Sequence, residues 1–167
     1  HPGQGRGAAI VTGITGAVLA VVAVVAAGWI TGTPELRSIV PGSAQMKFQT
    51  AVALAALATG VRRRDGRAGQ LLPAVTGAIA AIALVEYVLG WGSGFDEFPF
   101  EDTGKFPGRM SALTAMSLLL LSVGWGLTGG RRVREWGQVA IVAATIPSLL
   151  TLVGSLLRVP ALYGSAV

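Results

Sequence analysis

Five long apolar runs, separated by short charged segments, constrain this chain more than any other feature of its sequence. They cover about 8–30, 44–61, 71–91, 111–128 and 137–157, and the second is short. A helix needs about 20 mostly apolar residues to cross the hydrocarbon core of a bilayer. Charged residues make up 13% of the 167-residue chain, against about a quarter in a soluble domain. The sequence therefore predicts an all-α integral membrane protein with five transmembrane helices.

The segments between the runs alternate in charge, and this alternation predicts the orientation of the chain. Arginine clusters follow the second and fourth runs: Arg62, Arg63, Arg64 and Arg67, and then Arg131, Arg132 and Arg134. Cytoplasmic loops of membrane proteins are enriched in Lys and Arg. Both clusters, together with the N-terminus, are therefore expected on the cytoplasmic side of a bacterial cytoplasmic membrane. The acidic loop 92–109 and the C-terminus are then expected on the outer side.

A short string occurs twice, each time where a run begins. "PGSAQMKFQTA" leads into the second run and "PGRMSALTA" into the fourth, and both contain M-x-x-x-T-A. The first and third runs both end in Gly-Trp, with Trp29 and Trp91. The repeated unit is a helical hairpin that enters the membrane in the same direction each time. We therefore expect a single transmembrane domain, 1–167, with repeat 1 at about 8–67, repeat 2 at about 71–135 and part of a third at about 137–167.

The string "PGRMSALTAMSLLLLSVG" resembles the multipass membrane input regions of bacterial sensor histidine kinases and diguanylate cyclases. Those regions carry a P-G-R-M-S-x-x-T-A string that enters a Leu-rich helix. The matching residues here are Pro107, Gly108, Arg109, Met110, Ser111, Thr114 and Ala115, with a weaker echo at Pro41, Gly42, Met46, Thr50 and Ala51. The resemblance implies a sensor input domain without catalytic residues of its own. An input domain passes its signal to a cytoplasmic output module, whereas the C-terminus here is expected outside. The chain is then either a fragment or a protein without the output role.

Glu86 is the acidic residue that lies within an apolar run, in the string "IALVEYVLG". An ionisable group at membrane depth often carries protons, binds a cation or pairs with a partner. However, Glu86 is only about one helical turn from Trp91, close to the expected outer surface. There a carboxylate can also reach the interface or bond to Tyr87 or a loop. Both interpretations stay open at the level of the sequence.

The loop after the third run combines acidic and aromatic residues. Its candidate contact residues are Phe95, Asp96, Glu97, Phe98, Phe100, Glu101, Asp102 and Phe106. Four carboxylates can bind calcium, but their spacing matches no calcium loop. So many phenylalanines indicate a surface that docks on a partner protein or on the membrane. Trp29 and Trp91 complete the outer contact candidates, while Arg62, Arg63 and Arg64 are candidates for binding anionic lipid headgroups.

The remaining side chains exclude several classes of function. The chain has no cysteine, and its one histidine is His1, so no histidine ligand for haem or chlorophyll lies in the membrane. No Ser/His/Asp set and no phosphate-binding loop is present, so we expect no enzyme, no catalytic or metal site and no bound cofactor other than lipids or apolar pigments. The basic clusters flank apolar runs, which argues against nucleic acid. The expected function is a non-catalytic accessory subunit of a larger bacterial membrane complex, photosynthetic or respiratory, whose partners are other integral membrane proteins and lipids. The alternative is a sensor input domain.

Overall fold

The computed structural model describes residues 2–38, 45–64, 66–90, 100, 110–130 and 132–157, and these ranges contain helices and no strand. The helices are α1 (Pro2–Ile30), the 3-10 helix η1 (Pro34–Arg37), α2 (Phe48–Arg62), α3 (Arg67–Leu89), α4 (Ala112–Thr128), α5 (Arg134–Ala143) and α6 (Thr145–Leu156). Three stretches are long and apolar enough to cross a membrane: Gly7–Ile30, Arg67–Leu89 and Arg134–Gly154. Helices α2 and α4 are apolar but shorter. The predicted all-helical character is confirmed.

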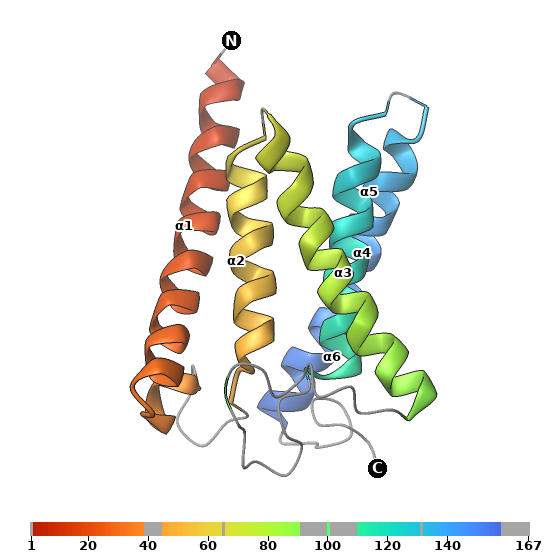
Figure 1. Ribbon diagram of the computed structural model, residues 1–167. Helices are drawn as coiled ribbons and strands as arrows, with labels where there is room; N and C mark the ends of the chain where they lie inside the picture. Colours follow the sequence, from red (N-terminus) through yellow and green to blue (C-terminus); the bar gives the residue numbers. More distant parts are fainter. Residues whose placement is uncertain are drawn as a thin grey trace.

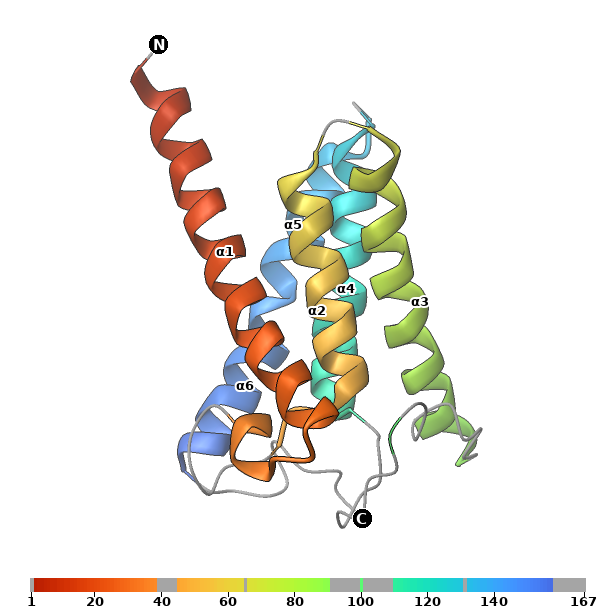
Figure 2. The same cartoon turned by 60° about the vertical axis from the view of Figure 1, so that its left-hand side comes forward.

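Helices α1 to α5 follow one another in the order of the chain as a curved row, and α6 lies below α5 at the other end of α4 (Figure 1). Helix α1 packs on α2 and η1, α2 on α3, α3 on α4, and α4 on both α5 and α6. Helix α1 forms one edge of the row and leans away from the other helices toward its N-terminus (Figure 2). The α2–α3 and α4–α5 turns, which carry the arginine clusters, lie at the same end of the bundle (Figure 1). We call this the basic end; η1 lies at the opposite end.

Two helices begin at different positions from those expected. Helix α2 begins at Phe48 rather than near 44, because Lys47 before it is extended and the amide of Met46 donates to the carbonyl of Arg37, 2.7 Å away. Helix α3 begins at Arg67 instead of 71, directly after Gly66, whose φ of 120° is accessible mainly to glycine. Helix α3 ends at Leu89, so the expected run to 91 is two residues too long.

The fifth run forms two helices, which meet at Ala144. Pro147 has no N–H, so the carbonyl of Ala143, one turn earlier, has no partner from the helix backbone at that position. Nearby hydroxyl groups bond to the carbonyls on either side: Thr145 donates to Val142 at 2.6 Å, and Ser148 donates to Ala144 at 2.8 Å. The fifth run is therefore broken three residues before Pro147.

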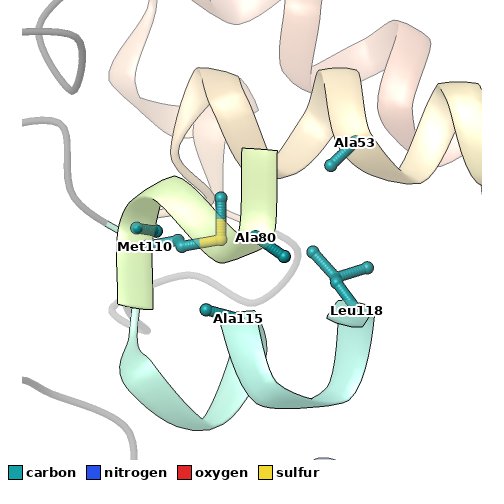
Figure 3. Close-up of a cluster of buried hydrophobic side chains, with 6 residues drawn as sticks. Ala53, Ala80, Met110, Ala115 and Leu118 are labelled. Carbon is teal, nitrogen blue, oxygen red and sulfur yellow. The ribbon is translucent and has the colours of Figure 1, made fainter. Parts of the chain in front are cut away.

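Small side chains line the interior of the bundle. Ala53 of α2, Ala80 of α3 and Ala115 of α4 surround Met110 and Leu118, and all five side chains are buried (Figure 3). A second cluster joins α1 to α2 and consists of Val22, Val25, Trp29 and Ala51. Lipid tails are as apolar as leucine, so helices in a membrane associate through close packing and polar contacts rather than through the hydrophobic effect. Alanine at the crossings permits that closeness.

Candidate functional site

Trp29 organises the end of the bundle opposite the basic end. Its side chain is 4% exposed, and the indole N–H donates to the carbonyl of Met46 at 3.0 Å. The guanidinium carbon of Arg37 lies 4.2 Å from the centre of the Trp29 ring, and its Nε donates to the carbonyl of Gly28 at 3.2 Å. Gly28 has no room for a side chain, because a Cβ there would lie 2.7 Å from the Cβ of Leu36. These contacts fix η1 against the end of α1.

Phe100 joins this group from the acidic loop. Its ring centre lies 5.9 Å from that of Trp29 and 5.0 Å from that of Phe48, which it meets edge-on. The structure thus brings together two of the predicted contact residues, Trp29 and Phe100. They contact each other within the chain, and Trp29 is too buried to form an outer surface. Their proposed role toward a partner stays a prediction.

The second M-x-x-x-T-A string has a related arrangement. Met110 is buried, and its carbonyl accepts a hydrogen bond from the hydroxyl of Tyr87 at 2.9 Å. Ser111 caps α4 by accepting from the amide of Thr114 at 3.2 Å. In both strings, therefore, an aromatic donor on the preceding helix bonds to the methionine carbonyl. The sequence identified the Gly-Trp ends as part of the repeat and indicated neither hydrogen bond; Tyr87 lies one turn before the second Gly-Trp end.

Glu86 is 3% exposed and lies on the inner face of α3. It continues the buried positions Thr76, Ala80 and Ala83 along that face. The backbone carbonyl of Glu86 accepts from the amide of Gly90, which places it in the last turn of α3. Burial within the bundle excludes neither a bond to Tyr87 or a loop nor a functional role, so both interpretations of Glu86 stay predictions.

Polar bonds between helices lie closer to the basic end. The hydroxyl of Thr76 donates to the carbonyl of Ala53 at 2.9 Å and links α3 to α2. The hydroxyl of Ser122 donates to the carbonyl of Pro73 at 2.6 Å and links α4 to α3. Because hydroxyl groups are short and can donate to carbonyls of a neighbouring helix, they hold small-residue interfaces together in a bilayer.

Trp125 supplies a hydrogen bond that Pro73 removes. Pro73 lies inside α3 and has no N–H, so the carbonyl of Gly69, four residues earlier, receives no bond at that position of the helix. The indole N–H of Trp125 donates to this carbonyl from α4 at 2.8 Å. Neighbouring helices commonly satisfy carbonyls that proline leaves bare in a membrane. Nothing in a single sequence shows which carbonyl the ring of Trp125 will meet.

Replacing Trp125 with Phe is expected to destabilise the protein by about 1–2 kcal/mol, because the Gly69 carbonyl loses its donor. Pro73→Ala provides the control, because it restores a backbone N–H within reach of the same carbonyl. On that background we expect Trp125→Phe to cost less than about 0.5 kcal/mol. Denaturation in mixed detergent micelles measures both values. Equal costs on the two backgrounds would contradict this role for Trp125.

Arg62 is the last residue of α2, and Arg63 and Arg64 follow it in the α2–α3 turn; all three are exposed at the basic end. The guanidinium carbon of Arg64 lies 5.8 Å from the centre of the Trp125 ring. The other predicted contact residues lie outside the described residues: Trp91, Phe95, Asp96, Glu97, Phe98, Glu101, Asp102 and Phe106. Within the described ranges, no three Asp, Glu, His or Cys side chains gather in a way that would hold a metal ion.

Compared with protein-family models, with curated proteins and with solved structures, the chain matches none. The resemblance to sensor input regions therefore stays a prediction from the sequence. The features on which a function can be argued are the packing of the helices and the surfaces that this packing leaves open.

Proposed function

We propose that this chain is a non-catalytic integral membrane subunit that packs against a larger membrane complex and stabilises its assembly. The observation that carries the proposal is a row of small exposed residues on α1. Gly13, Ala17, Ala20 and Ala27 are exposed, and with the larger Val24 between them they follow one another at alternating intervals of four and three residues. We call this row the small-residue face. That spacing keeps them on one side of a helix, as in a helix–helix seam.

The opposite side of α1 contacts the rest of the chain. Thr15, Val22, Val25 and Trp29 are buried there, at the same type of spacing. At about 100° per residue, the two rows lie on nearly opposite sides of α1. The small-residue face therefore points away from α2, toward lipid or a partner.

Gly13 and Gly16 of α1 differ from the glycines at the helix crossings. A Cβ added at Gly60, Gly124 or Gly137 would lie less than 3 Å from an atom of a neighbouring segment. A Cβ at Gly13 or Gly16 would meet nothing within 4 Å. A glycine inside a helix costs about 1 kcal/mol relative to alanine, so the open space beside Gly13 and Gly16, on a face of mostly small residues, supports a neighbour supplied by another molecule. Lipid alone does not require such small residues.

The exposed surface of α5 and α6 has the composition expected for contact with lipid. It carries bulky side chains, among them Val139, Val142, Ile146, Leu149 and Leu152. Small residues are enriched where helices pack on one another in a membrane. The contrast between the two edges of the row supports a partner helix at α1 and lipid at α5–α6.

The proposal includes the finer topology. Five spans would cross a bacterial cytoplasmic membrane, with α2 and α4 as short spans and the basic end facing the cytoplasm. The shared end of the two arginine-bearing turns supports this orientation under the positive-inside rule. The matching bonds to the carbonyls of Met46 and Met110 support two related hairpins.

The test is the native mass of the protein after mild detergent extraction from its own membrane. We expect a particle far larger than 17.0 kDa, with fixed companion proteins identified by mass spectrometry. Ala17→Leu with Ala20→Leu would fill the small-residue face, and we expect at least about a tenfold loss of companions, equivalent to about 1.4 kcal/mol of interface energy.

The control is Val139→Leu with Val142→Leu, which enlarges two exposed residues on the edge assigned to lipid. This variant should retain its companions, and both variants should keep the wild-type helix content. A wild-type protein that migrates alone, or only with copies of itself, would overturn the proposal. Equal loss of companions in the two variants would overturn the assignment to α1.

A further inference from the structure

A shallow pocket of about 410 Å³ lies at the α2–α3 turn. It is lined by Arg62, Arg63, Arg64, Gly66, Arg67 and Ala68. Four arginines therefore share one small hollow. In the sequence, Asp65 is the acidic residue within this turn, and it lies outside the described residues. Even with that charge counted, the turn is strongly positive, so the hollow favours an anion.

The beginning of α3 adds to the positive potential. Gly66 stands at the N-cap position and has no side chain to accept from the first amides of the helix. The first turn of α3 carries no acidic residue. The backbone N–H groups at a helix N-terminus and the helix dipole both attract anions such as phosphate. Gly66, Arg67 and Ala68 place this helix end in the wall of the pocket itself.

The turn is held in place by packing on α3 and α4. Gly69 allows the turn to approach closely, because a Cβ there would collide with the carbonyl oxygens of Arg63 and Arg64. Arg64 lies over the ring of Trp125, which is itself bonded to the Gly69 carbonyl. A cation over an aromatic face is held by the ring's negative potential. The pocket therefore has a defined backbone frame.

Apolar surface begins directly beside the pocket. Leu71 is 62% exposed, and Val75, one turn further along α3, is also exposed. Trp125 lies nearby, and tryptophan side chains are enriched at the boundary between lipid headgroups and hydrocarbon. A phospholipid would place its phosphate among the arginines while its chains follow Leu71 and Val75. A phosphate compound from solution would make no use of that surface.

We propose that this pocket binds the phosphate group of an anionic phospholipid. The guanidinium groups of the turn donate hydrogen bonds to the phosphate oxygens, and the free amides at the start of α3 face the same anion. Guanidinium presents a planar set of donors that matches two phosphate oxygens at once. This proposal concerns the chain by itself and needs no partner protein, so it stands or fails independently of the assembly proposed for α1.

The experiment measures lipid retention by the purified full-length chain in neutral detergent, using native mass spectrometry. Phosphatidylglycerol and phosphatidylcholine are added in equal amounts. The wild-type chain is expected to retain the anionic lipid preferentially. Arg62→Gln with Arg64→Gln should lower the apparent affinity for phosphatidylglycerol by about fivefold for each arginine removed. Binding of phosphatidylcholine should not change.

The matched control is Arg132→Gln with Arg134→Gln, which removes the same charge at the other turn of the basic end. It should keep the preference of the wild-type chain within about twofold, because the proposed site is intact. A similar loss in both double variants would show a general effect of surface charge and would overturn the site. No preference for phosphatidylglycerol in the wild-type chain would also overturn it.

Two further arms distinguish a lipid headgroup from free phosphate, and paired guanidinium donors from positive charge alone. Inorganic phosphate at millimolar concentration should not displace the lipid, and displacement would show that the pocket takes phosphate from solution.

Arg62→Lys with Arg64→Lys keeps the charge but loses the paired guanidinium donors, and it should retain the lipid less well than the wild type and better than the Gln variant. If the Gln variant loses its helix content, the Lys variant tests the proposal in its place. Wild-type affinity of the Lys variant for phosphatidylglycerol would contradict the proposed guanidinium–phosphate geometry.

Discussion

Replacing Gly124 with alanine is expected to lower the free energy of unfolding by about 2–3 kcal/mol, because the new methyl group would force two helices apart. A Cβ at this position would lie 2.8 Å from the carbonyl oxygen of Gly137 and 2.7 Å from Cγ1 of Ile141. The relation is mutual, since a Cβ at Gly137 would lie 2.7 Å from the carbonyl oxygen of Gly124. These obstacles are largely backbone, which cannot rotate away as a flexible side chain can.

Gly126 provides the matched control, two residues further along the same helix. It is exposed, and a Cβ there would meet nothing within 4 Å. Alanine has a higher helix propensity than glycine by about 1 kcal/mol, so Gly126→Ala should leave stability unchanged or raise it. The two variants are thus expected to shift stability in opposite directions. Denaturation in mixed detergent micelles, followed by circular dichroism, measures both. Equal effects would contradict the close crossing of α4 and α5.

The second large effect is expected for Trp29→Ala, which should cost about 3–5 kcal/mol. The substitution removes a buried ring, its hydrogen bond to the Met46 carbonyl and the surface on which Arg37 rests. Without these contacts, η1 and the start of α2 lose their attachment to the end of α1. Trp29→Phe keeps a ring but loses the N–H, so it should cost less, by an amount that includes about 1 kcal/mol for the hydrogen bond.

Trp136→Ala is the control for this substitution, because the Trp136 ring is 69% exposed. Its loss should change the unfolding free energy in micelles by no more than about 0.5 kcal/mol. Thermal unfolding in detergent gives the ranking of the three variants. A cost for Trp136→Ala as large as that for Trp29→Ala would show that general aromatic content, rather than the contacts of Trp29, determines stability.

The existence and order of the helices were predictable from the sequence, because long apolar runs indicate directly which segments are removed from water. The placement of both arginine-bearing turns at one end also follows from an alternating path of helices. Helix ends were less predictable. The start of α3 at Arg67 depends on the backbone of Gly66, and the break at Ala144 is shifted from Pro147, the residue that causes it. Hydropathy does not carry information on either.

The partners of side chains were not predictable, for a physical reason. In a chain that is apolar on all sides of its helices, hydropathy cannot show which face contacts protein and which contacts lipid. The hydrogen bonds of Tyr87, Ser122 and Trp125 end on backbone carbonyls, which every residue offers, so no pattern of residue types identifies them. The burial of Glu86 depends in the same way on the rotation of α3 about its axis.

The bonds between α3 and α4 also determine how this bundle can move. The carbonyls of Gly69 and Pro73 lie one turn apart on α3 and receive their donors from Trp125 and Ser122, about one turn apart on α4. A slide of one helix along the other would separate Trp125 from the Gly69 carbonyl, which Pro73 leaves without a backbone donor, and would break the bond from Ser122 to the Pro73 carbonyl. Helices α3 and α4 therefore form a pair that tilts or rotates as one body. A rearrangement of this bundle is therefore expected at its two edges, where α1 contacts α2 and where the fifth run breaks at Ala144.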